Sequence, residues 1–91
     1  MFPIHYSKQY RKSYKRLVKS GDFDSEELDS VIDTLASGKK LPEKYKDHSL
    51  SGTLSAYREC HVRPDLVMIY TFTESNLLVI ADIGSHSELF G

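Results

Sequence analysis

The chain has 91 residues, of which 40% are hydrophobic and 27% charged, proportions typical of one folded domain with a modest core. No apolar run reaches the length needed to span a bilayer, the first residues lack the segments of a signal peptide, and a single cysteine excludes an internal disulfide. We therefore expect one domain over residues 1–91 in the reducing cytoplasm, without membrane contact.

The formal net charge of −1 conceals a segregated charge pattern. Residues 1–21 carry six basic side chains and no acidic one, whereas residues 22–33 carry six acidic side chains and no basic one. A folded chain could gather its basic segments on one side, as a nucleic-acid partner would require. The alternative is that the first basic segment is simply the solvated face of a helix.

Periodicity assigns the first half of the chain to one strand and two helices. Alternating apolar residues predict a short strand over residues 2–6. Apolar residues at helical spacing predict a basic amphipathic helix over residues 8–20, capped by Ser7, and a second helix from about residue 24 to Gly38.

The second half reads as a long connection followed by three strands. Residues 39–55 lack periodicity, and a loop of that length in so small a domain is often functional. Strands are predicted over residues 56–62, 66–72 and 77–82, followed by a tail, residues 84–91, that is expected to pack down. This order predicts an α+β fold with two helices on one face of a small antiparallel sheet and the other face open to solvent or a ligand.

Simple tight hairpins would define the sheet register. One face would then carry two cross-strand rows: His61, Val67 and Asp82, and beside them Glu59, Ile69 and Ile80. The opposite face would carry Arg58, Cys60, Met68, Tyr70, Val79 and Ala81. A slip of one residue would reverse the two faces.

Three linked motifs stand out in the second half of the chain. Residues 45–52 read YKDHSLSG, residues 57–65 read YRECHVRPD, and residues 84–91 read GSHSELFG. In order and spacing they resemble the YafQ-type toxins of the RelE/ParE superfamily, with their YKDH-x-L-x-G loop, YR-x-x-H-x-x-PD hairpin and G-[ST]-H-x-x-LFG end. The resemblance is close over residues 45–91 and extends to the layout of the first half.

The resemblance implies a metal-independent endoribonuclease that needs no cofactor and cuts messenger RNA during translation, in the ribosomal A site. It also implies a cognate antitoxin, usually of the ribbon-helix-helix type, that silences the toxin. Operator DNA would be bound only through the complex of the two proteins. The chain has no paired H-x-x-x-H or C-x-x-C spacing, so a zinc site is not indicated.

Matching positions assign candidate site residues. His48, His61, Asp65 and His86 are the candidate catalytic residues, and Phe90, Arg63 and Lys46 are candidates for RNA binding. Cleavage by the RNA 2′-hydroxyl needs a base for that hydroxyl and an acid for the leaving 5′-oxygen, and histidine, with an ordinary pKa of about 6.5, suits both roles. The resemblance favours His86 as the acid, with His48 and His61 as base and phosphate contact.

Two of these candidates also have structural interpretations. Asp65 follows Pro64 and could be a turn former as readily as a base or orienting group. Phe90 could stack on an RNA base or fill the core.

The chain departs from the family pattern at two positions. Leu66 stands where the family often has an aromatic residue, and Asp82 stands where it has an arginine that would hold the scissile phosphate. In the expected register Asp82 lies near His61, where a carboxylate would favour the imidazolium form of that ring; the alternative is a solvated aspartate at a strand end.

The departure at Asp82 keeps two other functions open. One is a toxin of the same fold that acts by binding only, as the ParE branch does on DNA gyrase. The other is a degenerate toxin retained as the antitoxin's partner and co-repressor. The tail histidine and the H-x-x-x-D hairpin favour the ribonuclease instead.

Overall fold

The computed structural model describes residues 1–21 and 23–91. Its elements, in chain order, are β1 (Ile4–Tyr6), α1 (Lys8–Lys19), α2 (Ser25–Ala36), the 3-10 turn η1 (Glu43–Tyr45), β2 (His48–Ser49), the 3-10 turn η2 (Gly52–Leu54), β3 (Arg58–Arg63), β4 (Leu66–Phe72), β5 (Leu78–Gly84) and α3 (His86–Phe90). No helix in this described part is long and apolar enough to cross a membrane.

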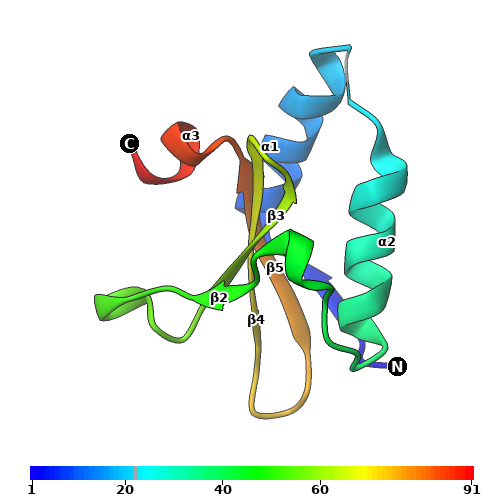
Figure 1. Ribbon diagram of the computed structural model, residues 1–91, viewed down its shortest axis with the longest axis vertical. Helices are drawn as coiled ribbons and strands as arrows, with labels where there is room; N and C mark the ends of the chain where they lie inside the picture. Colours follow the sequence, from blue (N-terminus) through cyan, green and yellow to red (C-terminus); the bar gives the residue numbers. More distant parts are fainter. Residues whose placement is uncertain (22) are drawn as a thin grey trace.

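The five strands form one sheet in the order β1-β5-β4-β3-β2. Helix α2 lies on one side of this sheet, whereas β2 with its loop and the C-terminal α3 project from the other side (Figure 1). The predicted α+β architecture is confirmed. Three details of the elements differ from the prediction. Strand β1 pairs with β5 in parallel, so the sheet is mixed. The expected connection contains the short strand β2, and the expected tail forms the helix α3.

Helix α1 is fixed to the sheet through Ser7, the residue that precedes it. The Ser7 hydroxyl accepts a hydrogen bond from the Tyr10 backbone N–H at 2.9 Å and donates one to the Ala81 carbonyl at 2.6 Å. Ser7 is therefore the helix cap that the sequence predicted, and it also joins α1 to β5.

The core lies between the helices and one face of the sheet. From the sheet it takes Met68, Tyr70 and Ile80, and from α2 it takes the apolar stripe that includes Leu28 and Val31, all at most 1% exposed. Side chains of one strand alternate between its two faces, so the neighbours of these sheet residues point to the open face.

The register on the open face differs from the prediction. Pairing of His61 with Val67 and of Glu59 with Ile69 is confirmed. An irregularity between Ile69 and Tyr70 then places Val67 opposite Gly84 and Ile69 opposite Asp82. The observed rows are therefore His61–Val67–Gly84 and Glu59–Ile69–Asp82.

This irregularity also changes which residues of β5 lie on the opposite face. Tyr70 pairs with Ile80, so Ala81 is an extra residue between two paired positions of β5, as in a β-bulge. Val79 pairs with Thr71 and is not among the core residues. Ala81 was not predicted as an extra residue because neither Gly nor Pro marks a bulge at this place in the sequence.

Cys60 gives a test of this core. It is fully buried on β3, and burial raises the pKa of its thiol to about 12, so the reactive thiolate is suppressed in the folded protein. We expect an aromatic disulfide reagent to leave Cys60 unmodified at neutral pH and to label it stoichiometrically in urea, as followed by absorbance. Rapid labelling of the native chain, at the rate of a free cysteine control, would contradict this packing.

Candidate active site

The loop that carries His48 is anchored at Tyr45. This side chain is buried, and its hydroxyl donates to Glu27 Oε2 of α2 at 2.8 Å, which raises the Tyr45 pKa. Lys46 then adopts the left-handed conformation with a φ of 50°, which turns the chain sharply after the anchor. The YKDH segment therefore works as an anchor and a turn that deliver His48 to the sheet edge.

A second set of contacts joins this loop to β3. Arg58 Nε donates to Asp47 Oδ1 at 3.0 Å, and Arg58 Nη1 donates to Ser49 Oγ at 2.9 Å. These two contacts flank His48 in the sequence. They support the short β2 pairing, in which His48 lies opposite Glu59.

Glu59 lies between two of the candidate histidines. Its carboxylate oxygen Oε1 is 2.9 Å from His48 Nε2 and 3.7 Å from His61 Nε2. The glutamate is only 5% exposed, whereas the His48 and His61 side chains are 52% and 23% exposed. The structure thus brings His48 and His61 together around a buried carboxylate.

Glu59 was not among the site residues predicted from the sequence. Its position could have indicated it, because Glu59 lies two residues before His61 and therefore on the same face of the strand. Burial of an acid, which normally needs a compensating partner, is what singles it out in the structure.

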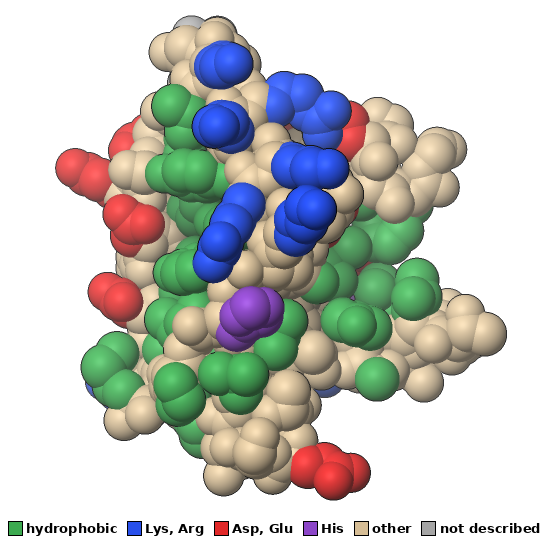
Figure 2. Space-filling view, turned by 180° about the vertical axis from the view of Figure 1, so that it is seen from behind, with side chains coloured by type: hydrophobic (Ala, Val, Ile, Leu, Met, Phe, Trp, Pro, Cys, Tyr) green, Lys and Arg blue, Asp and Glu red, His purple; other side chains and the backbone are tan. Residues whose placement is uncertain are grey.

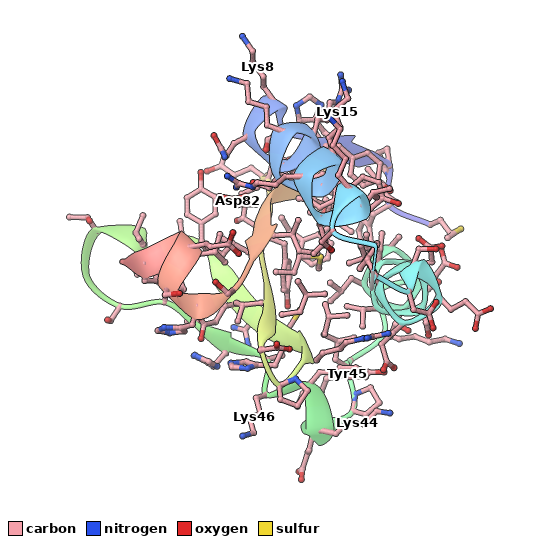
Figure 3. All side chains as sticks on the ribbon, turned by 90° about the horizontal axis from the view of Figure 1, so that it is seen from above. Lys8, Lys15, Lys44, Tyr45, Lys46 and Asp82 are labelled. Carbon is pink, nitrogen blue, oxygen red and sulfur yellow. The ribbon has the colours of Figure 1, made fainter. Side chains whose placement is uncertain are left out.

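The expected contact between Asp82 and His61 is wrong. Asp82 Oδ1 accepts hydrogen bonds from the Ser13 hydroxyl at 2.6 Å and from the Ile83 backbone N–H at 2.8 Å. Figure 3 shows Asp82 beneath α1. The bulge in β5 moves Asp82 to the Glu59 row, and its carboxylate then holds the buried Ser13 of α1.

The tail motif forms a short helix with a complete cap. Ser85 Oγ accepts from the Glu88 backbone N–H at 3.2 Å, and the Glu88 carboxylate accepts from the Ser85 backbone N–H at 2.8 Å, which is a capping box. This cap places His86 at the first helical position with its ring exposed. The His86 and Phe90 ring centroids are 4.8 Å apart.

Phe90 is 37% exposed and is not among the core residues, so the interpretation as a core residue is wrong. Leu89, its neighbour, is half-buried. The aromatic ring therefore stays at the surface beside His86.

The observed register relates His86 to the other histidines. Gly84 ends the row that begins at His61, two strand spacings away, or about 10 Å, and His86 follows Gly84 by two residues. Helix α3 and strand β2 also project from the same side of the sheet (Figure 1). The elements that carry His48 and His86 therefore lie on the side of the sheet that the His61 row faces.

The remaining candidates border this face. Asp65 is an exposed turn residue, and it lines a cavity of about 350 Å³ together with Arg63 and Ser85, which brings the β3–β4 turn next to the tail. Arg63 Nη2 lies 3.7 Å from Asp24 Oδ2.

Lys46 is exposed and lines a second cavity, of about 390 Å³, that also includes His61 and Arg63.

The basic segments do not gather on one side as expected. Figure 2 shows Lys and Arg side chains clustered over one face of the molecule, and the exposed basic residues of α1 are Lys8, Arg11, Lys12, Lys15, Arg16 and Lys19. Lys44 and Lys46 lie at the opposite end of the molecule from Lys8 and Lys15 (Figure 3). The chain thus has two separate basic regions.

A family model and a curated relative match nearly the whole chain. A family model described as the bacterial toxin of type II toxin–antitoxin system, YafQ, matches residues 2–91. The mRNA interferase toxin YafQ of Escherichia coli K12 is 39% identical over 89 residues, which cover 97% of this chain and 95% of that protein.

Solved structures agree over the whole chain. A metal-bound toxin from Helicobacter pylori is 45% identical with a TM-score of 0.91, covering 99% of this chain and all of that one. A chain of the E. coli DinJ–YafQ complex matches with a TM-score of 0.88 and 36% identity, covering all of this chain and all of that one. In this chain, the residues that the structure describes contain no group of three or more His, Cys, Asp or Glu side chains arranged to hold a metal ion.

The capping box predicts a pH dependence of α3. Hydrogen bonds from Ser85 lower the Glu88 pKa below its usual 4.5, so this stabilisation is complete above pH 4.5 and is lost as the pH falls through the lowered folded-state pKa. We expect the Ser85 amide to be protected from hydrogen exchange at pH 6 and to lose that protection in strong acid before the sheet amides do. Glu88→Gln should reduce the protection at pH 6, and an unchanged Ser85 amide in that variant would contradict the assignment.

Proposed function

Because the chain belongs to the YafQ family of bacterial type II toxins, we propose that it is a ribosome-dependent endoribonuclease that cleaves translated mRNA. The observation that carries this proposal is the grouping of His48 and His61 around Glu59 on the face that also bears the His86 tail. Histidines on one open face supply both of the proton transfers that RNA cleavage requires.

The proposed reaction is metal-independent acid–base catalysis without a cofactor. A histidine of the Glu59 cluster removes the proton of the RNA 2′-hydroxyl, whose oxygen attacks the adjacent phosphorus. His86 gives a proton to the leaving 5′-oxygen, which breaks the P–O bond and leaves a cyclic phosphate. The exposed position of His86 on a capped helix supports this role, since the ring can reach a bound strand.

Side chains around the histidines are proposed to hold the RNA. Phe90 presents its ring beside His86, where an unstacked base can pack on it. Arg63 and Lys46 line one cavity with His61 and are proposed to contact phosphates. Asp65 borders the same face and is kept as a candidate orienting group in addition to its position in the turn.

We also propose a cognate antitoxin partner, as in the DinJ–YafQ complex of E. coli, with a ribbon-helix-helix part through which the complex would bind operator DNA. An apolar groove of about 660 Å³ between α1 and α2 includes Tyr10, Tyr14 and the half-exposed Val18. Arg11 and Lys15 also line it. This groove fits an antitoxin segment with apolar anchors and acidic flanks. The cytoplasm is the proposed location.

Asp82 favours a second candidate function. Its hydrogen bond to Ser13 uses it as a structural group, so position 82 brings no positive charge to a phosphate. A toxin of the same fold that acts by binding only, or a degenerate toxin retained as an antitoxin partner, is the alternative that this observation supports.

The ribonuclease proposal predicts a defined effect of His86→Ala. Purified chain, freed of antitoxin, should cut mRNA on programmed ribosomes at sites in register with the A-site codon, and His86→Ala should lower the single-turnover rate by roughly 10²–10⁴-fold. His5→Ala is the matched control, because His5 is also an exposed histidine and lies on β1. Absence of cuts by the native chain would contradict the proposal, and cuts that appear only in Asp82→Arg would identify a degenerate toxin.

The groove predicts how the antitoxin binds. Val18→Glu puts an acidic group among apolar anchors and beside the expected acidic flanks, so it should weaken the cognate antitoxin by about 1–3 kcal/mol in titration calorimetry. Thr34→Glu on α2, outside the groove, is the control and should leave the affinity unchanged. Equal affinity of the native chain and Val18→Glu would place the antitoxin elsewhere.

A further inference from the structure

We propose that Glu59 is a positioning residue that holds the His48 ring through its Nε2 atom and leaves His61 as the base. The inference deepens the proposed ribonuclease function and rests on it for its catalytic meaning. The arrangement of the three side chains is a separate claim that can be tested without any cleavage assay.

The position of Glu59 needs a chemical reason. A carboxylate that is 5% exposed loses most of its hydration, a cost that partners must offset. In the part of the chain that the structure describes, the ion-pair contacts of Glu59 are with His48 and His61. A glutamine or an apolar side chain would fill this strand position without that cost if packing were its purpose.

The hydrogen bonds of His48 define how its ring is used. Nδ1 lies 2.6 Å from the Lys46 carbonyl oxygen, which can only accept, so Nδ1 carries a proton. Nε2 lies 2.9 Å from Glu59 Oε1, and an ionised carboxylate also only accepts. A proton shared between Nε2 and Oε1 occupies both atoms, so neither ring nitrogen of His48 is free to take a proton from RNA.

His61 is placed differently by the same oxygen. Its Nε2 is 3.7 Å from Glu59 Oε1, beyond hydrogen-bond range. The carboxylate orients this ring without occupying its nitrogen, so His61 keeps a lone pair for the 2′-hydroxyl proton. One buried glutamate thus gives two neighbouring histidines two different roles.

The first experiment is NMR of the free protein. Ring ¹⁵N shifts of His48 in the native chain should show protons on both nitrogens. In Glu59→Gln, whose amide can donate to Nε2, His48 should change to the single tautomer with its proton on Nδ1. Glu74→Gln, in the exposed β4–β5 turn, removes the same charge and should leave the His48 shifts unchanged.

The second experiment measures cleavage on ribosomes. Glu59→Gln should lower kcat by about 10²-fold or more, by analogy with the loss of the orienting carboxylate in catalytic triads, with KM within about threefold of native. Glu59→Asp restores a carboxylate and should recover part of the loss. Thermal unfolding of each variant separates this effect from loss of folding.

Two results would overturn the proposal. Native His48 ring shifts in a folded Glu59→Gln protein would show that Glu59 does not control the ring. A kcat loss equal in Glu59→Gln and Glu59→Asp, and explained by the fraction unfolded at the assay temperature, would show that Glu59 is only structural. If the native chain cleaves nothing, the proposed function fails while the NMR result still decides the positioning role.

Discussion

Pairing of β4 with both β3 and β5 is the constraint on which the rest of the molecule depends. Met68 and Tyr70 on β4 meet Cys60 and Ile80 on the neighbouring strands, so one face of the sheet is committed to the helices. Because side chains alternate, the opposite face receives whatever residues lie between them. The polar row that begins at Glu59 is therefore a consequence of where the core lies.

The loop that carries His48 needs contacts beyond strand pairing to hold it in place. Strand β2 has two residues and cannot hold His48 by pairing alone. The buried Tyr45 and the Arg58 contacts to Asp47 and Ser49 fix the loop on both sides of the histidine. After β5, the capping box of α3 does the equivalent for His86. Each histidine is thus held by an ordinary structural device, a buried anchor or a helix cap.

The exposed basic side chains of α1 and those of the Lys44–Lys46 turn lie on different parts of the surface. The basic side chains of α1 form one exposed cluster, and the Lys44–Lys46 turn forms a second at the other end (Figures 2 and 3). The apolar groove runs along α1 beside the first cluster. Arg11 and Lys15 also line this groove, so the apolar and the basic side chains of α1 lie next to one another.

The sequence by itself determined the order of the two long helices and four of the five strands, the α+β class, the Ser7 cap and the three motifs that contain His48, His61 and His86. These follow from local periodicity, capping chemistry and spacing, which operate within a few residues. Tertiary structure decided the rest. The bulge at Ala81 moved Asp82 from the His61 row to Ser13, and Glu59 emerged as the carboxylate between His48 and His61. Such relations depend on inter-strand register and burial, because a shift by one residue changes every partner across a sheet, and no local pattern in the chain encodes that shift.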